Sequence, residues 1–118
     1  MRFQKFPIYN EIRVFIKEIY KLSKELPKYE QFELASQLRR ASTSILLNLA
    51  EGSMKLSDAE LNRHVLIGIG SLAEIVAILD ICLDQEYIDA SIHDQYVLKC
   101  ELITKQLYGF SRKLKSTS

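Results

Sequence analysis

Eight polar residues near the middle of the chain have side chains that could bind an anion or transfer a proton. They are Arg39, Arg40, Asn48, Glu51, Arg63, His64, Ser71 and Glu74. Glu74 falls inside an apolar run, and a carboxylate buried among aliphatic side chains needs a cation or several donors. Arginine suits this role because its planar guanidinium group binds both carboxylate oxygens. Two interpretations are open: a binding or catalytic pocket, or a buried polar network that sets helix register and assembly. We favour the network.

Patterns typical of metal-dependent or nucleophilic catalysis are weak. Glu60 and His64 are one residue further apart than the Glu-x-x-His pairs of di-iron bundles. The two histidines and two cysteines form no cluster that would bind zinc. Ser42, Thr43 and Ser44 have no base beside them in the sequence. We therefore predict no metal, no cofactor and no enzymatic activity.

The letters G-x-G-x-x-A of a dinucleotide-binding turn occur from Gly68 to Ala73. In that motif the glycines form a turn between a strand and a helix, whereas here a helical pattern begins upstream and continues through both glycines. Glycine inside a helix costs about 1 kcal/mol relative to alanine. We predict instead that Gly68 and Gly70 allow a neighbouring backbone to approach closely.

The elements that position these residues are four predicted helices, at about residues 8–26, 31–52, 58–85 and 90–114. The first has apolar residues alternately four and three positions apart, and Pro27 ends it. Gly52 is expected to end the second helix in the left-handed conformation. Ser57 opens a capping box before the third helix, and Asp89 or Ser91 caps the fourth.

Three short connections between these helices predict an antiparallel up-down-up-down four-helix bundle, an all-α fold in a single domain of residues 1–118. The N-terminal sequence MRFQKFPIYN lacks the apolar region of a secretory signal, which predicts a cytoplasmic protein. In this arrangement Cys82 and Cys100 lie about 10 Å apart along the helix axes, beyond the reach of a disulfide. We predict two buried thiols.

Helices two and three turn near residues 55–56, so facing residues have numbers that sum to about 112. This register pairs Leu38 with Glu74, Ala41 with Ser71, Asn48 with His64, and Glu51 with Leu61. It also predicts that both Arg39 and Arg40 lie within a turn of Glu74, and that Arg63 lies near Glu51.

The run Val65–Leu83 has only two acids in nineteen residues and is nearly long enough to span a membrane. Glu74 at its centre would be costly in a bilayer, so we predict no membrane insertion. Both this run and Ile45–Leu47 have apolar residues on more faces than a lone bundle can bury. We expect a homo-oligomer that buries the surplus through Leu46, Leu47, Leu66, Ile69, Ala73, Val76 and Ala77.

Charge is distributed unevenly although the net charge is only +1. Residues 1–28 carry +4, residues 29–56 are neutral, residues 57–88 carry −5 and residues 89–118 carry +2. In an up-down bundle helices one and four are neighbours, so their basic faces can merge into one surface, with the two lysine clusters at different heights. We predict nucleic-acid contacts at Lys17, Lys21, Lys24, Lys28, Lys105, Arg112, Lys113 and Lys115. An ordinary solvated lysine face is the alternative.

Three segments have the pattern of a known family: QLRRASTSI at 37–45, NLAEG at 48–52 and GSLAE at 70–74. Ile19-Tyr20, Leu26-Pro27 and Tyr87-Ile88 extend the likeness over most of the chain. The chain resembles the four-helix-bundle proteins encoded in 23S ribosomal RNA intervening sequences. It departs from them at Leu46, where proline is usual, which predicts a straighter second helix. It also departs at Glu86, where glycine is usual, so the following turn must be made differently or carry strain.

The resemblance implies a small bundle that assembles into rings, with pentamers expected, and no established enzymatic activity. It also implies kinship with the accessory variability determinant of diversity-generating retroelements, a bundle that binds nucleic acid and a reverse transcriptase. Our leading hypothesis is a non-enzymatic, homo-oligomeric bundle that binds structured RNA, or DNA, through helices one and four. The alternative is an assembly or adaptor module with a protein partner. The third hypothesis is an enzyme with a pocket around Arg40 and Glu74.

Overall fold

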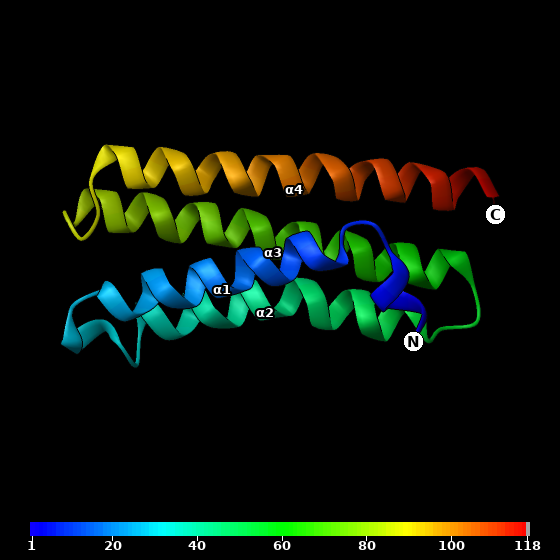
Figure 1. The fold of residues 1–118 in the computed structure, drawn as a ribbon, viewed down its shortest axis with the longest axis horizontal. Coiled ribbons are helices and arrows are strands. Elements are labelled where there is room, and N and C mark those ends of the chain that lie inside the picture. The colour runs from blue at the N-terminus through cyan, green and yellow to red at the C-terminus, as the bar shows by residue number, and fades with distance from the viewer. Residues whose placement is uncertain (118) are drawn as a thin grey trace.

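Four long helices lie side by side along one axis and form a rod with extents of 46 × 23 × 19 Å. The computed structural model describes residues 1–117, so the last residue of the predicted domain, Ser118, lies outside the described residues. The elements are η1 (Arg2–Lys5), α1 (Tyr9–Glu25), η2 (Lys28–Glu30), α2 (Leu34–Ser53), α3 (Asp58–Asp84) and α4 (Ala90–Thr117). Short connections join the helices at alternate ends of the rod (Figure 1). The predicted all-α, up-down-up-down bundle is confirmed.

Most helix ends have the caps that the sequence predicts. α1 stops at Glu25 and the chain becomes extended at Leu26, directly before Pro27. The Ser57 hydroxyl accepts the backbone N–H of Glu60 at 3.2 Å and opens α3. The Asp89 carboxylate accepts the backbone N–H of Ile92 at 2.8 Å and opens α4. Each oxygen satisfies a backbone donor that the first helical turn leaves free.

The turn after α3 carries the strain expected at Glu86. This residue has φ 62°, the left-handed conformation, and no other non-glycine residue described has a positive φ. The N–H of Tyr87 bonds to the carbonyl of Cys82 at 2.9 Å, and that of Glu86 bonds to the carbonyl of Leu83 at 3.0 Å. These two bonds form a Schellman motif, in which glycine usually occupies the position of Glu86.

α2 ends near Gly52, as predicted, but Gly52 itself does not adopt the predicted left-handed conformation. It is helical, α2 continues to Ser53, and no described glycine has a positive φ. A Cβ at Gly52 would lie only 2.7 Å from the Cβ of His64, so the glycine is needed for the close approach of α2 and α3. Gly68 lies beside the Ile45 backbone, but a Cβ there would be 3.8 Å from the Ile45 Cα, an ordinary van der Waals distance that does not require glycine. Nothing lies within 4 Å of a Cβ at Gly70, so the predicted close approach is wrong there.

The core lies between the apolar stripes of all four helices. Its largest fully buried side chains are Ile12, Phe15, Ile19, Leu38, Ile45, Leu49, Leu61, Val65, Leu72, Ile75, Leu79 and Leu107. Cys82 and Cys100 are buried in this core, as predicted. Burial raises the pKa of the Cys82 thiol to about 11 and that of Cys100 to about 12. Both thiols therefore stay protonated at neutral pH and are poor nucleophiles.

The four helices are not equally close to one another. α3 packs tightly against α2 and α4, whereas α1 packs against α2 and makes only a loose seam with α4. Across that seam the Tyr96 hydroxyl donates to the Glu18 carbonyl at 3.1 Å, and the Lys99 ammonium forms an ion pair with the Glu18 carboxylate. The side of α2 and α3 that faces away from this core remains open to solvent.

Candidate interaction surfaces

A chain of polar side chains crosses the interface between α2 and α3. The Ser71 hydroxyl donates to the Ser44 hydroxyl at 2.9 Å, and the Asn48 amide donates to the same oxygen at 3.0 Å. The Asn48 carbonyl oxygen lies 3.0 Å from Nδ1 of His64. The predicted register pairs Asn48 with His64, as observed. It pairs Ser71 with Ala41, whereas Ser71 contacts Ser44, which lies one helical turn further along α2. The register of the α2–α3 hairpin is therefore confirmed.

The donor directions in this chain favour a structural role. Because the Asn48 amide nitrogen points at Ser44, its oxygen faces His64, and Nδ1 of His64 must carry the proton. The other ring nitrogen, Nε2, is buried without a hydrogen-bond partner among the described residues. His64 therefore donates to Asn48 and does not act as a base toward either serine hydroxyl.

Four members of the predicted buried network are exposed instead, and the prediction of burial is wrong for them. They are Arg40, Glu51, Arg63 and Glu74. Arg40 and Glu74 do line one hollow of about 350 Å³ between α2 and α3, together with Gln37, Ala41 and Ser44. No ion pair joins Arg40 and Glu74 within residues 1–117. Glu74 is exposed because its side of α3 is covered by no other helix of the chain.

Arg39 acts at a different place from the one predicted. Its guanidinium group donates to the Ser23 hydroxyl at 3.1 Å and to the Gln31 carbonyl at 3.0 Å. The Gln31 amide in turn donates to the carbonyls of Ser23 and Leu26, both at 2.9 Å. The Gln31 amide thus satisfies carbonyls at the C-terminal end of α1. The Arg39 guanidinium group binds the Ser23 hydroxyl at the same end, where a positive charge is favourable. Arg39 and Gln31 form a clamp that holds the corner between α1 and α2.

The predicted oligomer-interface residues divide into three groups by exposure. Leu47 is 64% exposed and Leu66 is 41% exposed, and Ala73 and Ala77 are also on the surface. Leu46 and Val76 are half-buried and pack partly against the core. Ile69 is buried within its own chain. A surface for another copy therefore consists of the first group and its exposed neighbours.

Two members of this group, Leu47 and Ala77, belong to two parallel rows on the open side of the bundle. Leu66 and Ala73 lie beside these rows on α3. On α2 the row is Gln37, Arg40, Ser44, Leu47 and Glu51. On α3 the row is Ile67, Gly70, Glu74, Ala77 and Ile81. In both rows the residues are alternately three and four positions apart, the spacing of a helix seam that packs against another helix. We call the two rows together the outer α2–α3 face.

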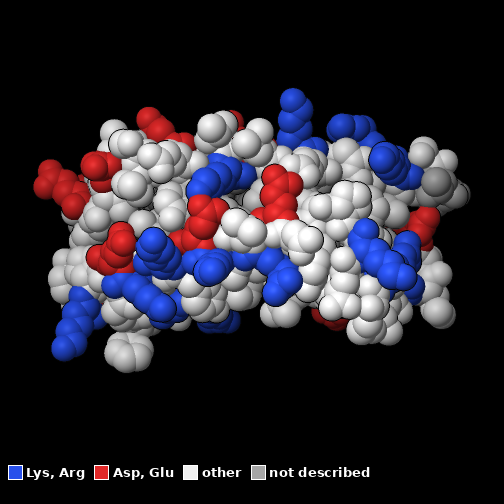
Figure 2. Space-filling model, in the orientation of Figure 1, with Lys and Arg blue, Asp and Glu red and all other residues white. Residues whose placement is uncertain are grey.

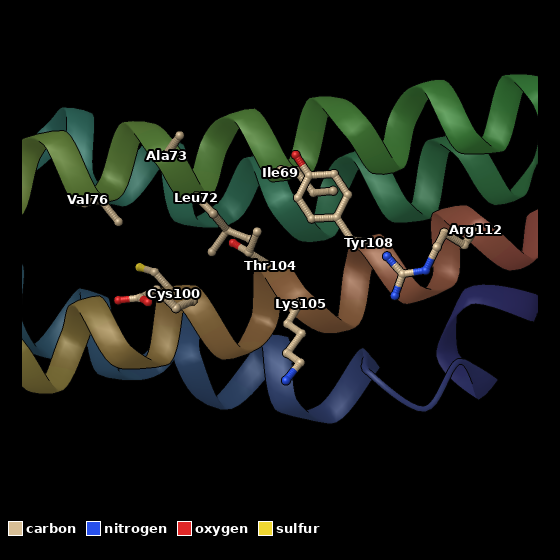
Figure 3. Close-up of a pocket in the computed structure, with 10 residues that line it drawn as sticks. Ile69, Leu72, Ala73, Val76, Cys100, Thr104, Lys105, Tyr108 and Arg112 are labelled. Carbon is tan, nitrogen blue, oxygen red and sulfur yellow. The ribbon is translucent and has the colours of Figure 1, made fainter.

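A groove of about 630 Å³ runs between α3 and α4 on another side of the rod (Figure 3). It is lined by Ile69, Leu72, Ala73, Val76, Cys100, Glu101, Thr104, Lys105, Tyr108 and Arg112. In Figure 3 Tyr108 and Arg112 reach along the groove from α4, whereas Lys105 extends away from α3. The groove therefore brings predicted interface residues of α3 close to two of the predicted cations of α4.

Lysines follow one face of α1 and continue into η2. Lys17, Lys21, Lys24 and Lys28 are all exposed, and the first three line a hollow of about 470 Å³ together with Glu18 and Tyr20. We call these four residues the lysine row. No ion pair involves them within residues 1–117, whereas the neighbouring Glu18 is paired with Lys99. Figure 2 shows basic side chains in a band over α1, with acidic side chains gathered at the end where α3 and α4 join.

The predicted cations of α4 do not join the lysine row. α1 and α4 run in opposite directions, so their C-terminal halves lie at opposite ends of the rod (Figure 1). Lys113 lines a pocket of about 270 Å³ with Phe6 and Phe110, whose ring centroids are 5.0 Å apart. The guanidinium carbon of Arg2 lies 5.6 Å from the Phe6 ring centroid. We call Arg2 and Lys113, together with the Phe6 and Phe110 rings, the second basic cluster. Arg2 was not predicted as a member because η1 lies outside the predicted helices.

α3 is the one described helix that is long and apolar enough to cross a membrane by length and composition. Within its most apolar window 44% of the residues are buried inside the bundle. Glu74 and Asp80 are exposed on its surface. This distribution is typical of a helix that packs against other helices of a bundle on one side and exposes its opposite side.

The sequence model of the 23S rRNA-intervening sequence protein family matches residues 4–109. The chain belongs to this family. No curated protein sequence matches the chain closely enough to count as a relative.

The region that matches the 23S rRNA-intervening sequence protein family contains the lysine row, the Arg39–Gln31 clamp between α1 and α2, and the outer α2–α3 face. It ends before Arg112 of the α3–α4 groove and Lys113 of the second basic cluster, so these two cations lie beyond the matched region. The matched region therefore covers α1, α2, α3 and the larger part of α4, including Lys105 in the α3–α4 groove.

Proposed function

We propose that this 23S rRNA-intervening sequence protein forms a homo-oligomer that binds nucleic acid, structured RNA in particular, through the lysine row. The observation that carries the proposal is four exposed lysines on one face, none of them neutralised by a carboxylate within residues 1–117. Such a row attracts phosphates, and binding releases the counterions that had condensed on the nucleic acid. Several copies in one assembly would multiply these contacts.

The outer α2–α3 face supports the oligomer. Leu47, Ile67 and Ile81 on it are between 41% and 64% exposed, an apolar surface that a second copy would remove from water. Arg40 and Glu74 lie on the same face and have no ion-pair partner within residues 1–117. Copies that pack through this face would let the arginine of one copy meet the glutamate of another. The resemblance to ring-forming bundles favours a closed ring such as a pentamer.

Charge reversal tests the nucleic-acid contact. The triple variant Lys17→Glu, Lys21→Glu and Lys24→Glu should weaken RNA binding in fluorescence anisotropy. It should also flatten the dependence of log K on log salt by about 0.7 to 0.9 per lost phosphate contact. Lys21→Glu and Lys55→Glu make the same change in charge, but Lys55 lies at the opposite end of the rod, so only Lys21→Glu should weaken binding. Unchanged affinity and salt slope in the triple variant would contradict the proposal.

Sedimentation tests the assembly. The wild-type protein should sediment with a mass above the 13.6 kDa of one chain at micromolar concentration. Ile67→Glu puts a charge into the outer α2–α3 face and should produce monomers, whereas Leu98→Glu, at an exposed leucine of α4, should leave the mass unchanged. A monodisperse wild-type monomer would exclude the oligomer. A specific protein that co-purifies in the absence of nucleic acid would favour an adaptor function instead.

A further inference from the structure

The corner between α1 and α2 exposes two aromatic side chains. Phe32 is 92% exposed and Tyr29 is 75% exposed, more than any other aromatic side chain described. Aromatic rings in folded proteins are usually buried in a core or interface because they carry a large apolar area. Neither side chain contributes to the core of the chain. Two such rings at one corner indicate a contact with something outside the chain.

The corner that carries these rings is held firmly. The Arg39–Gln31 clamp fixes Gln31, the residue directly before Phe32, through bonds of 2.9 to 3.1 Å. The carboxylate of Glu30 accepts the Tyr87 hydroxyl at 2.9 Å, and the Tyr29 and Tyr87 rings meet edge to face at 6.3 Å. Because the backbone is already ordered, little conformational entropy is lost when a ligand packs on the rings.

Positive charge leads directly to this corner. Lys28 precedes Tyr29 in the chain, and the lysine row continues from it along α1. Tyr20, itself 37% exposed, lines the hollow between Lys17, Lys21 and Lys24. Glu18 is paired with Lys99, and Glu30 accepts a hydrogen bond from Tyr87. Glu25 and Glu33 form no ion pair within residues 1–117. Exposed cations and rings therefore follow one another along the chain from α1 into the corner.

We propose that the α1–α2 corner is a stacking site for unpaired nucleotides, with bases on Phe32 and Tyr29 and phosphates on the lysine row. This inference rests on the proposed function and names the part of the RNA that the same surface recognises. Every base has a π-face, so exposed rings bind single-stranded nucleic acid without reading its sequence, and basic side chains follow its backbone. The bases of a duplex are already stacked on one another and cannot reach the rings.

The distribution of apolar residues favours nucleotides over a lipid surface. Helices that lie in a membrane interface bury a broad apolar face along their length. Here the only fully apolar ring of the three is Phe32, while Tyr20 and Tyr29 lie next to lysines in the sequence. Apart from Tyr20, Val14 is the one large apolar side chain exposed on α1. Anionic vesicles nevertheless belong in the test, because lysine and aromatic residues together also occur at membrane surfaces.

Fluorescence anisotropy with three RNA probes tests the proposal: a blunt duplex, a hairpin with the same stem and a uridine loop, and oligouridine. Phe32→Ala should weaken binding of the hairpin and oligouridine about tenfold and leave the duplex unchanged, since stacking on one ring is lost. Phe32→Trp should preserve or increase loop binding. Because Phe32 is 92% exposed, neither change should unfold the bundle, and thermal melts check this. The matched control is Leu56→Ala, a fully exposed leucine at the opposite end of the rod.

The outcomes separate this inference from the proposed function. If the wild-type protein binds none of the three RNAs, the proposed function fails and the stacking site fails with it. If the lysine variants lose binding but Phe32→Ala binds all three probes as the wild type does, the stacking site alone is overturned. An equal loss for duplex and loop also overturns it. So does binding to anionic vesicles that depends on Phe32 while RNA binding does not.

Discussion

Gly52→Ala is expected to lower the free energy of unfolding by about 2 kcal/mol, although alanine is the better helix former. The new Cβ would lie 2.7 Å from the Cβ of His64 and 3.0 Å from Cδ1 of Leu61. The His64 Cβ is attached to the backbone of α3, so the contact is relieved only if α2 and α3 separate. Overpacking a core costs about 1–3 kcal/mol, and loss of the His64–Asn48 hydrogen bond adds about 1 kcal/mol. The higher helix propensity of alanine offsets about 1 kcal/mol of this.

Urea denaturation followed by circular dichroism measures this change, at one fixed protein concentration because assembly contributes to stability. Gly109→Ala is the control, since its Cβ would meet only the Arg112 side chain, at 3.8 Å. This change should raise the free energy of unfolding by about 1 kcal/mol. The two alanine variants should therefore differ by about 3 kcal/mol. If Gly52→Ala proved as stable as Gly109→Ala, the close approach of α2 and α3 at residue 52 would be refuted.

Arg39→Met should lower the free energy of unfolding in urea by about 2–3 kcal/mol because the α1–α2 clamp loses its charged donor, whereas Lys55→Met should change it by less than about 0.5 kcal/mol. Glu86→Gly should raise the free energy of unfolding by about 0.5–1 kcal/mol, because glycine adopts a positive φ without strain. The gain is limited because glycine loses more conformational entropy on folding. No gain would mean that the turn is unstrained. Hydrogen bonds with Asp80 and Asp94 raise the pKa of His93. Protonated His93 therefore stabilises the folded state. Its contribution to the free energy of unfolding is complete below the unfolded-state pKa of about 6.5 and is lost as pH rises through the higher folded-state pKa. The Tm of the wild type should therefore fall relative to that of His93→Gln between about pH 6 and pH 8, and parallel Tm profiles would show that His93 contributes nothing.

The fold could be predicted from the sequence because its main features repeat at short range. Ile12, Phe15 and Ile19 show the helical spacing of α1, and Pro27 marks its end. The capping box at Ser57 located α3 correctly. Once the hairpin turn was placed, antiparallel geometry alone predicted that Asn48 meets His64, as it does at 3.0 Å.

The side on which a polar residue lies was harder to predict. Arg39 and Arg40 are neighbours in sequence, so they point about 100° apart on a helix, and local sequence does not say which one reaches another element. Arg39 reaches back to Ser23 near the end of α1 and to Gln31 in the connection that follows, while Arg40 faces solvent. Glu74 is surrounded by aliphatic residues in the sequence, yet the open side of α3 leaves it exposed.

Glycine and aromatic residues were ambiguous for a related reason. A glycine near the end of a helix indicates either a left-handed cap or close packing, and only the position of His64 shows that Gly52 serves packing. Phe32 falls at the start of the second predicted helix, residues 31–52, whereas α2 begins only at Leu34, so helical periodicity does not apply to Phe32. Its exposure becomes clear only when the clamp at Arg39 shows how the corner is built.

Sedimentation velocity of the wild-type protein with an RNA hairpin, recorded at 260 and 280 nm, tests the central claim most directly. At moderate salt and micromolar concentration, the protein should move as an assembly heavier than 13.6 kDa that carries the hairpin with it. A boundary at the mass of one chain, with the RNA sedimenting separately, would contradict both the shared outer α2–α3 face and the lysine row as an RNA-binding surface.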